Sequence, residues 1–80
     1  MTSLHACYLG DVYTQVMGVY LQFKANLRRT DGDVNAAACM LGEASIVILD
    51  TVLCKLRGCV SPVERRAMLS AKIAYRLAMG

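Results

Sequence analysis

The sequence predicts an all-α fold in which three helices form a single small domain over residues 1–80. Apolar residues recur at helical spacing in three stretches, and two clusters of turn-forming residues separate those stretches. An α/β nucleotide-binding domain is excluded, because it needs several βαβ units of about 30 residues each. Hydrophobic residues make up 56% of the chain and there is one proline, a composition that excludes a disordered chain.

The first helix is predicted over residues 11–29, where one face repeats apolar residues three and four positions apart. These residues are Val12, Val16, Val19, Tyr20, Phe23 and Leu27. The opposite face carries the uncharged polar residues Gln15, Gln22 and Asn26, which we take as a candidate surface for a protein partner. The valines are β-branched, so a strand is the competing interpretation, but the spacing favours a helix.

The middle helix is predicted to be the longest, over residues 34–57, after the turn at residues 30–33. Asp33 is expected to cap its first turn, and Gly58 is a suitable residue just beyond its last turn. The segment is apolar around most of its circumference. The other two helices of the same chain could hardly cover so large an apolar surface. We therefore expect it to be mostly buried in a helical-bundle homodimer or higher oligomer. The run from Ile46 to Leu49 would also suit a buried strand.

The third helix is predicted to begin at Pro62, with Ser61 and Glu64 forming a capping box. Alanines recur along one of its faces and would let another helix approach closely. Together with the middle helix they provide the residues expected in the core or the oligomer interface. These are Leu41, Ile48, Leu49, Val52, Leu53, Leu56, Ala67, Ala71, Ala74 and Ala78.

The last third of the chain is basic. From Lys55 onward there are six Lys and Arg residues against one Glu, whereas the first 54 residues have three cations against five acids. We name Arg65, Arg66, Lys72 and Arg76 the basic set and take them as a second candidate surface for a partner. Such a surface could bind phosphate backbones or an acidic protein, or could simply keep an apolar chain soluble.

Neither catalysis nor a metal site is predicted, and no cofactor is expected. His5 is the only histidine, and no nearby Asn or Asp is placed to orient it as a base for Cys7. Cys54 and Cys59 could in principle join His5 and Cys7 around zinc, but their spacing does not match the usual paired-cysteine zinc motifs.

The N-terminus lacks the basic region and the apolar core of a signal peptide, so a cytoplasmic location with reduced cysteines is expected. Glu43 and Asp50 interrupt the most apolar stretch, which argues against a membrane span. An interfacial membrane helix is also disfavoured, because the apolar side of the third helix is mostly alanine.

These observations favour a small non-enzymatic regulator or adaptor that forms a homo-oligomer, most simply a dimer, and acts by binding another protein. The excess of apolar and uncharged surface motivates this hypothesis. One alternative is a dimeric nucleic-acid-binding protein that uses the basic set, although interleaved aromatic residues and a docking motif are missing. A second alternative is a secretion or assembly chaperone that shields an apolar segment of its partner.

Overall fold

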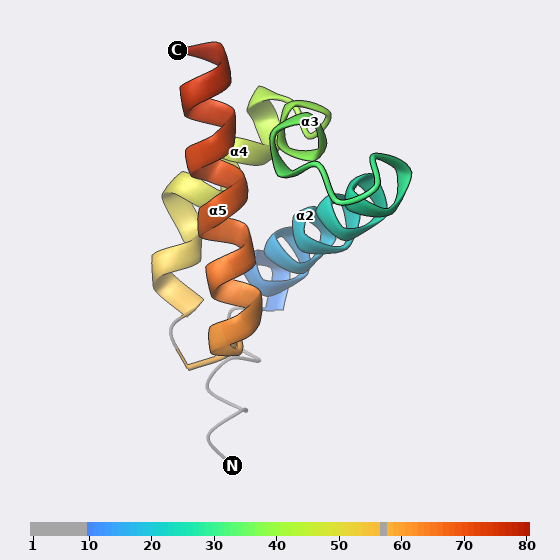
Figure 1. Cartoon of the computed structure of the whole chain (residues 1–80). Helices are drawn as coiled ribbons and strands as arrows, with labels where there is room; N and C mark the ends of the chain where they lie inside the picture. The colour runs from blue at the N-terminus through green and yellow to red at the C-terminus, as the bar shows by residue number, and fades with distance from the viewer. Residues whose placement is uncertain (1–9, 57) are drawn as a thin grey trace.

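The computed structural model describes residues 10–56 and 58–80, and the regular elements in these ranges are all helical. The order is α2 (Gly10–Arg29), α3 (Val34–Cys39), α4 (Glu43–Val52), the 3₁₀ helix η1 (Leu53–Leu56) and α5 (Pro62–Met79). The predicted all-α class is therefore confirmed. In Figure 1, α5 runs along one side of the molecule, α3 and α4 lie against it, and α2 crosses obliquely.

The turn between α2 and α3 has the backbone that its sequence predicts. Asp31 and Gly32 both have positive φ angles, 54° and 84°, a conformation that glycine adopts without steric cost and that Asp tolerates. The amide of Gly32 donates to the carbonyl of Leu27 over 2.8 Å and so closes the end of α2. Asp33 caps α3 as expected, because its carboxylate accepts the amide of Ala36 over 3.1 Å.

The expectation of one long middle helix over residues 34–57 is wrong. The segment is divided into α3, α4 and η1, and the chain between α3 and α4 turns at Gly42. Gly42 has φ 86° and ψ 162°, a backbone conformation essentially restricted to glycine. The predicted end of that helix falls on Arg57, which lies outside the described residues.

The division of the middle segment explains how one chain buries it. A straight helix of 24 residues would be about 36 Å long and could turn only part of its apolar circumference towards neighbouring helices. After the bend, α3 packs mainly against α5, while α4 packs against both α2 and α5. Ala37, Ala38, Ile46, Leu49 and Leu56 are each at most 1% exposed. The apolar excess of this segment is thus largely used inside the chain.

The predicted start of α5 is confirmed in detail. The amide of Glu64 donates to the Ser61 hydroxyl and the amide of Ser61 donates to the Glu64 carboxylate, both over 3.2 Å. Pro62 occupies the first turn, where its missing N–H costs nothing. This cap fixes where α5 begins and therefore which of its residues face the core.

Candidate functional site

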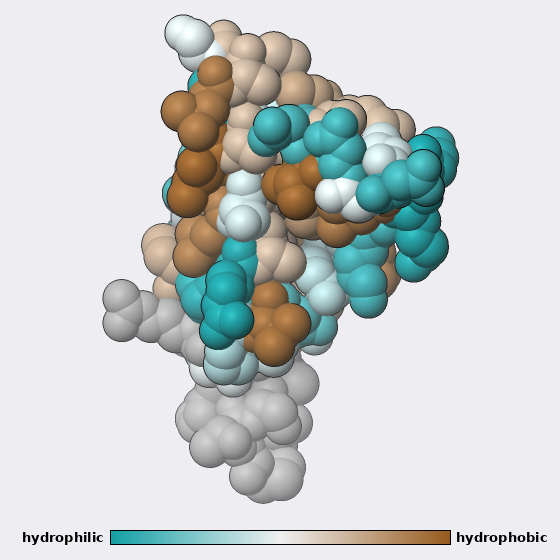
Figure 2. Space-filling model, viewed as in Figure 1, coloured by the Kyte–Doolittle hydropathy of each residue, from teal (hydrophilic) through white to brown (hydrophobic). Residues whose placement is uncertain are grey.

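The most conspicuous surface feature is a line of apolar side chains on the outer face of α5. Leu69, Ile73 and Leu77 are 37%, 55% and 81% exposed and follow one another at four-residue intervals. We call these three residues the α5 stripe. Figure 2 shows it as a column of apolar residues along the part of α5 nearer its C-terminal end. Three large aliphatic side chains in one line on a capped helix form a rigid apolar contact surface.

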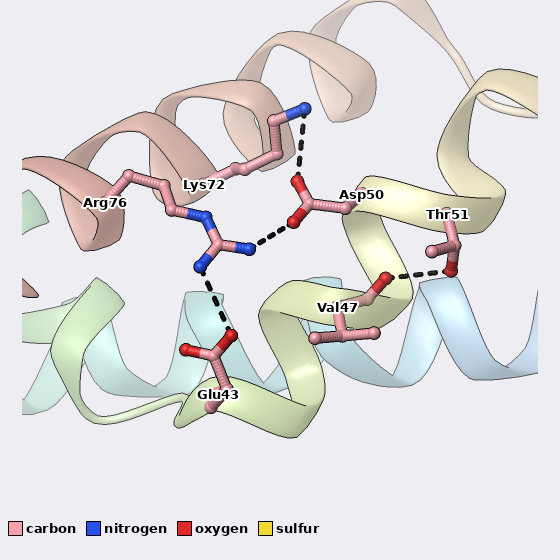
Figure 3. Close-up of polar contacts among 6 residues, drawn as sticks. All are labelled: Glu43, Val47, Asp50, Thr51, Lys72 and Arg76. Atoms are coloured by element: carbon pink, nitrogen blue, oxygen red, sulfur yellow. Dashed lines mark hydrogen bonds and ion pairs between the residues drawn. The ribbon is translucent and has the colours of Figure 1, made fainter. Parts of the chain in front are cut away.

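One edge of α5 carries an ion-pair cluster that joins it to α4 (Figure 3). Arg76 lies between two carboxylates: it donates to Glu43 over 3.2 Å and also to Asp50. Lys72, one turn earlier, pairs with the other oxygen of Asp50 over 3.3 Å. Because Glu43 and Asp50 are seven residues apart, both carboxylates lie on the side of α4 that faces α5. Two cations of the basic set are thereby neutralised within the chain.

The titration of Asp50, and of Tyr75 beside the cluster, is shifted in directions that follow from the contacts. The hydrogen bond from Arg76 and the added donor Lys72 lower the pKa of Asp50 below its ordinary 3.8, although partial desolvation opposes them. Burial raises the pKa of the Tyr75 phenol above its ordinary 10.0, and the nearby Glu43 carboxylate adds to this. At neutral pH Asp50 is therefore held ionised, and the α4–α5 pairs are formed.

We expect the Asp50→Asn variant to lose a small, pH-dependent part of the stability of the fold. A carboxyl group whose pKa is lower in the folded chain stabilises that fold above the unfolded pKa, and the benefit disappears as pH falls through the folded pKa. The Asp50 side chain is 30% exposed, so screening limits the effect to about 1 kcal/mol or less, a melting shift of at most about 4–8 °C.

Thermal melts of the Asp50→Asn variant and the wild type between pH 2 and pH 7 test this expectation. The difference in melting temperature between the two proteins should be largest near pH 7 and should vanish towards pH 2. Asp31→Asn is the matched control, because Asp31 is exposed and Asn also tolerates its positive φ. A difference that persists unchanged to pH 2 would contradict the assignment.

The two remaining members of the basic set have different roles. The Arg65 guanidinium donates to the backbone carbonyl of Leu53 over 3.2 Å and so ties the first turns of α5 to η1. Arg66 is exposed and makes no side-chain hydrogen bond or ion pair within residues 10–56 and 58–80. Three of the four predicted surface cations thus have partners in their own chain, and they do not form one open basic surface.

The candidate polar face of α2 is also divided by the fold. Gln15 and Gln22 are exposed as expected, and with Thr14, Gly18 and Leu21 they form an exposed, uncharged face of α2. Asn26, by contrast, is only 1% exposed. Asn26 is therefore a core residue, and it does not belong to a surface that a partner could reach.

Asn26 joins α2 to α3. Its side-chain amide donates to the carbonyl of Ala37 over 3.1 Å and accepts from Gln22 over 3.0 Å and from Arg29 over 3.4 Å. Ala37 lies in the last turn of α3, where carbonyl groups have no donor from their own helix. Because Asn26 supplies that donor, its polarity is satisfied in the interior.

The residues expected in the core or the oligomer interface lie mostly in the core of the single chain. Leu49, Leu53, Leu56, Ala71 and Ala74 are buried, while Leu41, Ile48, Val52 and Ala67 are partly buried against them. Ala78 is exposed. These residues therefore do not form an exposed interface. The large apolar side chains that α5 exposes are instead Val63, Leu69, Ile73, Leu77 and Met79, of which Leu69, Ile73 and Leu77 form one line.

Two patterns in the sequence correspond to the contacts of Asn26 and of the ion-pair cluster. The first is the spacing of Val16, Val19, Phe23 and Asn26, which continues the buried face of α2 through a polar residue. The second is the match between two acids seven residues apart in α4 and two cations four residues apart in α5, which predicts pairing between adjacent helices.

His5 and Cys7 lie outside the described residues. Within residues 10–56 and 58–80, no group of three or more His, Cys, Asp or Glu side chains is placed to hold a metal ion. Cys54 is exposed, whereas Cys39 and Cys59 are half-buried. In the same part of the chain, no helix combines the length and the apolar run that crossing a bilayer requires.

Comparison with known proteins gives no relative: the chain matches no protein-family model, no curated protein and no solved structure.

Proposed function

We propose that this chain is a small, non-enzymatic, homodimeric helical protein that acts as a regulator or adaptor by binding another protein. The observation that supports this proposal is the α5 stripe. Leu69, Ile73 and Leu77 remain exposed although the core of the described part of the chain already includes residues of each of its helices. Exposed apolar patches of this kind usually mark contact sites in soluble proteins.

The location of the stripe also favours a role in binding. It lies on a helix held by a capping box at its start and by ion pairs to α4 further along. A surface on a rigid helix loses little conformational entropy when a partner covers it. The exposed, uncharged face of α2 (Thr14, Gln15, Gly18, Leu21 and Gln22) is a second surface from which no charge would need to be desolvated.

Binding to a nucleic-acid backbone is less well supported than binding to a protein. Such binding depends on several cations that can neutralise phosphates. Lys72, Arg76 and Arg65 already contact acceptors in their own chain. Among contacts within residues 10–56 and 58–80, Arg66 is then the one cation of the basic set without a partner.

Photo-crosslinking tests whether the α5 stripe contacts protein in the cell. We expect a photoreactive phenylalanine analogue at Leu77 to crosslink to one reproducible protein, identified by mass spectrometry, which can be this chain itself or a different protein. The same analogue at Thr51, an exposed residue of α4, is the positional control.

Adding Ile73→Glu to the Leu77 probe should reduce that crosslink at least about tenfold, because a carboxylate would be desolvated in an apolar contact. Equal labelling from Leu77 and Thr51, or no crosslink from either position, would overturn the proposed function. A crosslink to a ribosomal or nucleic-acid complex only would support the alternative instead.

A further inference from the structure

The outer face of α5 has a spacing that is symmetric about Ile73. Leu69 and Leu77 lie four residues to either side of Ile73, and Arg66 and Gly80 lie seven residues to either side. At about 100° per residue, all four lie within about 40° of Ile73 around the helix axis. A copy of α5 that runs in the opposite direction therefore presents the same apolar residues at the same heights.

From this symmetry we infer that two copies of the chain pair through the α5 stripe, with their α5 helices antiparallel and a two-fold axis at Ile73. The inference rests on the proposed function, because it requires the stripe to be a protein contact, and it names the occupant as a second copy. Ile73 then meets Ile73 of the second copy, and Leu69 meets Leu77. Two-fold self-complementarity is the usual geometry of homodimer interfaces.

The charges at the two ends of the stripe are complementary in this arrangement. Arg66 is exposed, and the antiparallel pairing places it opposite the last turn of α5 in the second copy. Carbonyl groups at the end of a helix carry partial negative charge and favour a cation. Gly80 occupies the matching position without a side chain, which leaves room for the guanidinium. Parallel pairing would instead bring Arg66 next to Arg66 of the second copy.

The cations at the edge of the stripe are already neutralised. Lys72 and Arg76 would otherwise repel their counterparts when two α5 helices approach each other. Carboxylates of the same chain offset these charges: Asp50 pairs with Lys72 over 3.3 Å, and Glu43 pairs with Arg76 over 3.2 Å. The ion-pair cluster therefore lets two apolar stripes meet without an accumulation of positive charge.

The expected dimer is weak. A contact made mainly by one helix face falls in the small class of interfaces, below about 1,200 Å² in total, which form transient complexes. Dimerisation should therefore depend on concentration and be seen in the range of about 10 μM to 1 mM. Sedimentation equilibrium of the whole chain in reducing buffer measures it, and reducing conditions remove any contribution from the cysteines.

The first variant places a charge on the two-fold axis. Ile73→Glu brings two carboxylates together at the centre of the interface, and we expect it to raise the dimer dissociation constant at least about tenfold. Thr51→Glu adds the same charge on exposed α4 and should leave the constant unchanged. Both positions are exposed, so circular dichroism should show the wild-type helix content in both variants.

The second pair of variants tests the direction of pairing. Leu69→Lys combined with Leu77→Glu puts opposite charges together only when the helices are antiparallel, so this double variant should dimerise more tightly than Leu69→Lys combined with Leu77→Lys. Both double variants have the same two positions substituted, and they differ only at position 77, where the sign of the charge is reversed.

Three results would overturn the inference: a wild type that is monomeric up to 1 mM, a dimer that Ile73→Glu does not weaken, or equal association of the two double variants. The crosslinking experiment keeps these failures separate from failure of the proposed function. A crosslink from Leu77 to a different protein alone would refute self-pairing while leaving the protein-binding role intact.

Discussion

Replacing Ile46 with aspartate should unfold the chain or bring it close to unfolding at room temperature. Ile46 is 0% exposed and lies in α4, which packs against both α2 and α5. The substitution removes a buried aliphatic side chain, which alone costs about 2–5 kcal/mol, and adds a carboxyl group with no partner in an apolar site. A domain of this size has a total free energy of unfolding on the order of 5–10 kcal/mol.

The adjacent residue provides a closely matched control. Val47 is also β-branched and belongs to the same helix, but it is 43% exposed, so Val47→Asp should change the free energy of unfolding by less than about 1 kcal/mol. Chemical denaturation followed by circular dichroism measures both variants. If the two variants were equally stable, α4 would not have the register described here, because that register alone separates Ile46 from Val47.

Replacing Ala71 with tryptophan should also be severely destabilising, for a different reason. Ala71 is 0% exposed on α5, in the face that contains the buried Ala74 and packs against α3 with its buried Ala37 and Ala38. Small side chains on both helices let the backbones approach closely, so an indole has no space unless α3 moves away. Overpacking a close-packed site costs typically about 1–3 kcal/mol for small insertions, and an indole should reach the upper end or exceed it.

Ala78→Trp is the control for this second prediction. Ala78 lies seven residues after Ala71 and so nearly above it on α5, but it is exposed near the end of the helix. Its replacement should leave the melting temperature within a few degrees of the wild type. If Ala71→Trp melted like Ala78→Trp, the contact between α3 and α5 would be loose rather than close-packed.

The elements that sequence analysis predicted well are those with local causes. The C-terminal end of the first helix, the turn at residues 30–33, the Asp33 cap and the capping box of Ser61 and Glu64 depend on residues within a few positions of one another. Hydrogen bonds between such neighbours form whatever the rest of the chain does, so a pattern of residue types is enough to predict them.

The middle segment was predicted less well, because local preference and tertiary packing favour different structures there. Helical periodicity continues from α3 into α4, and Gly42 is an acceptable residue inside a helix at a cost of about 1 kcal/mol. The folded chain uses Gly42 for a bend instead, since the bend turns Ala37, Ile46 and Leu49 towards one core. Burying these side chains gains more free energy than the lost helical hydrogen bonds cost.

The candidate surfaces, too, could be predicted only where the cause is local in sequence. Polarity alone assigned Asn26 to the surface and the basic set to solvent, because polar and charged side chains are usually exposed. Asn26 is buried because α3 ends with a carbonyl group that needs a donor, and Arg76 is paired because α4 brings two carboxylates beside it. Neither partner is close in sequence to the residue it satisfies.

The sequence by itself determined the all-α class, the bounds of the first helix, the start of the last helix, the turn at residues 30–33 and the high proportion of apolar residues. Tertiary structure alone decided that the middle segment bends at Gly42 and that most of its apolar excess is covered within one chain. It also decided that Leu69, Ile73 and Leu77 form a line of exposed apolar side chains on α5. The physical reason is that helix caps and turns are satisfied by near neighbours, whereas the burial of a side chain depends on which helices pack against it.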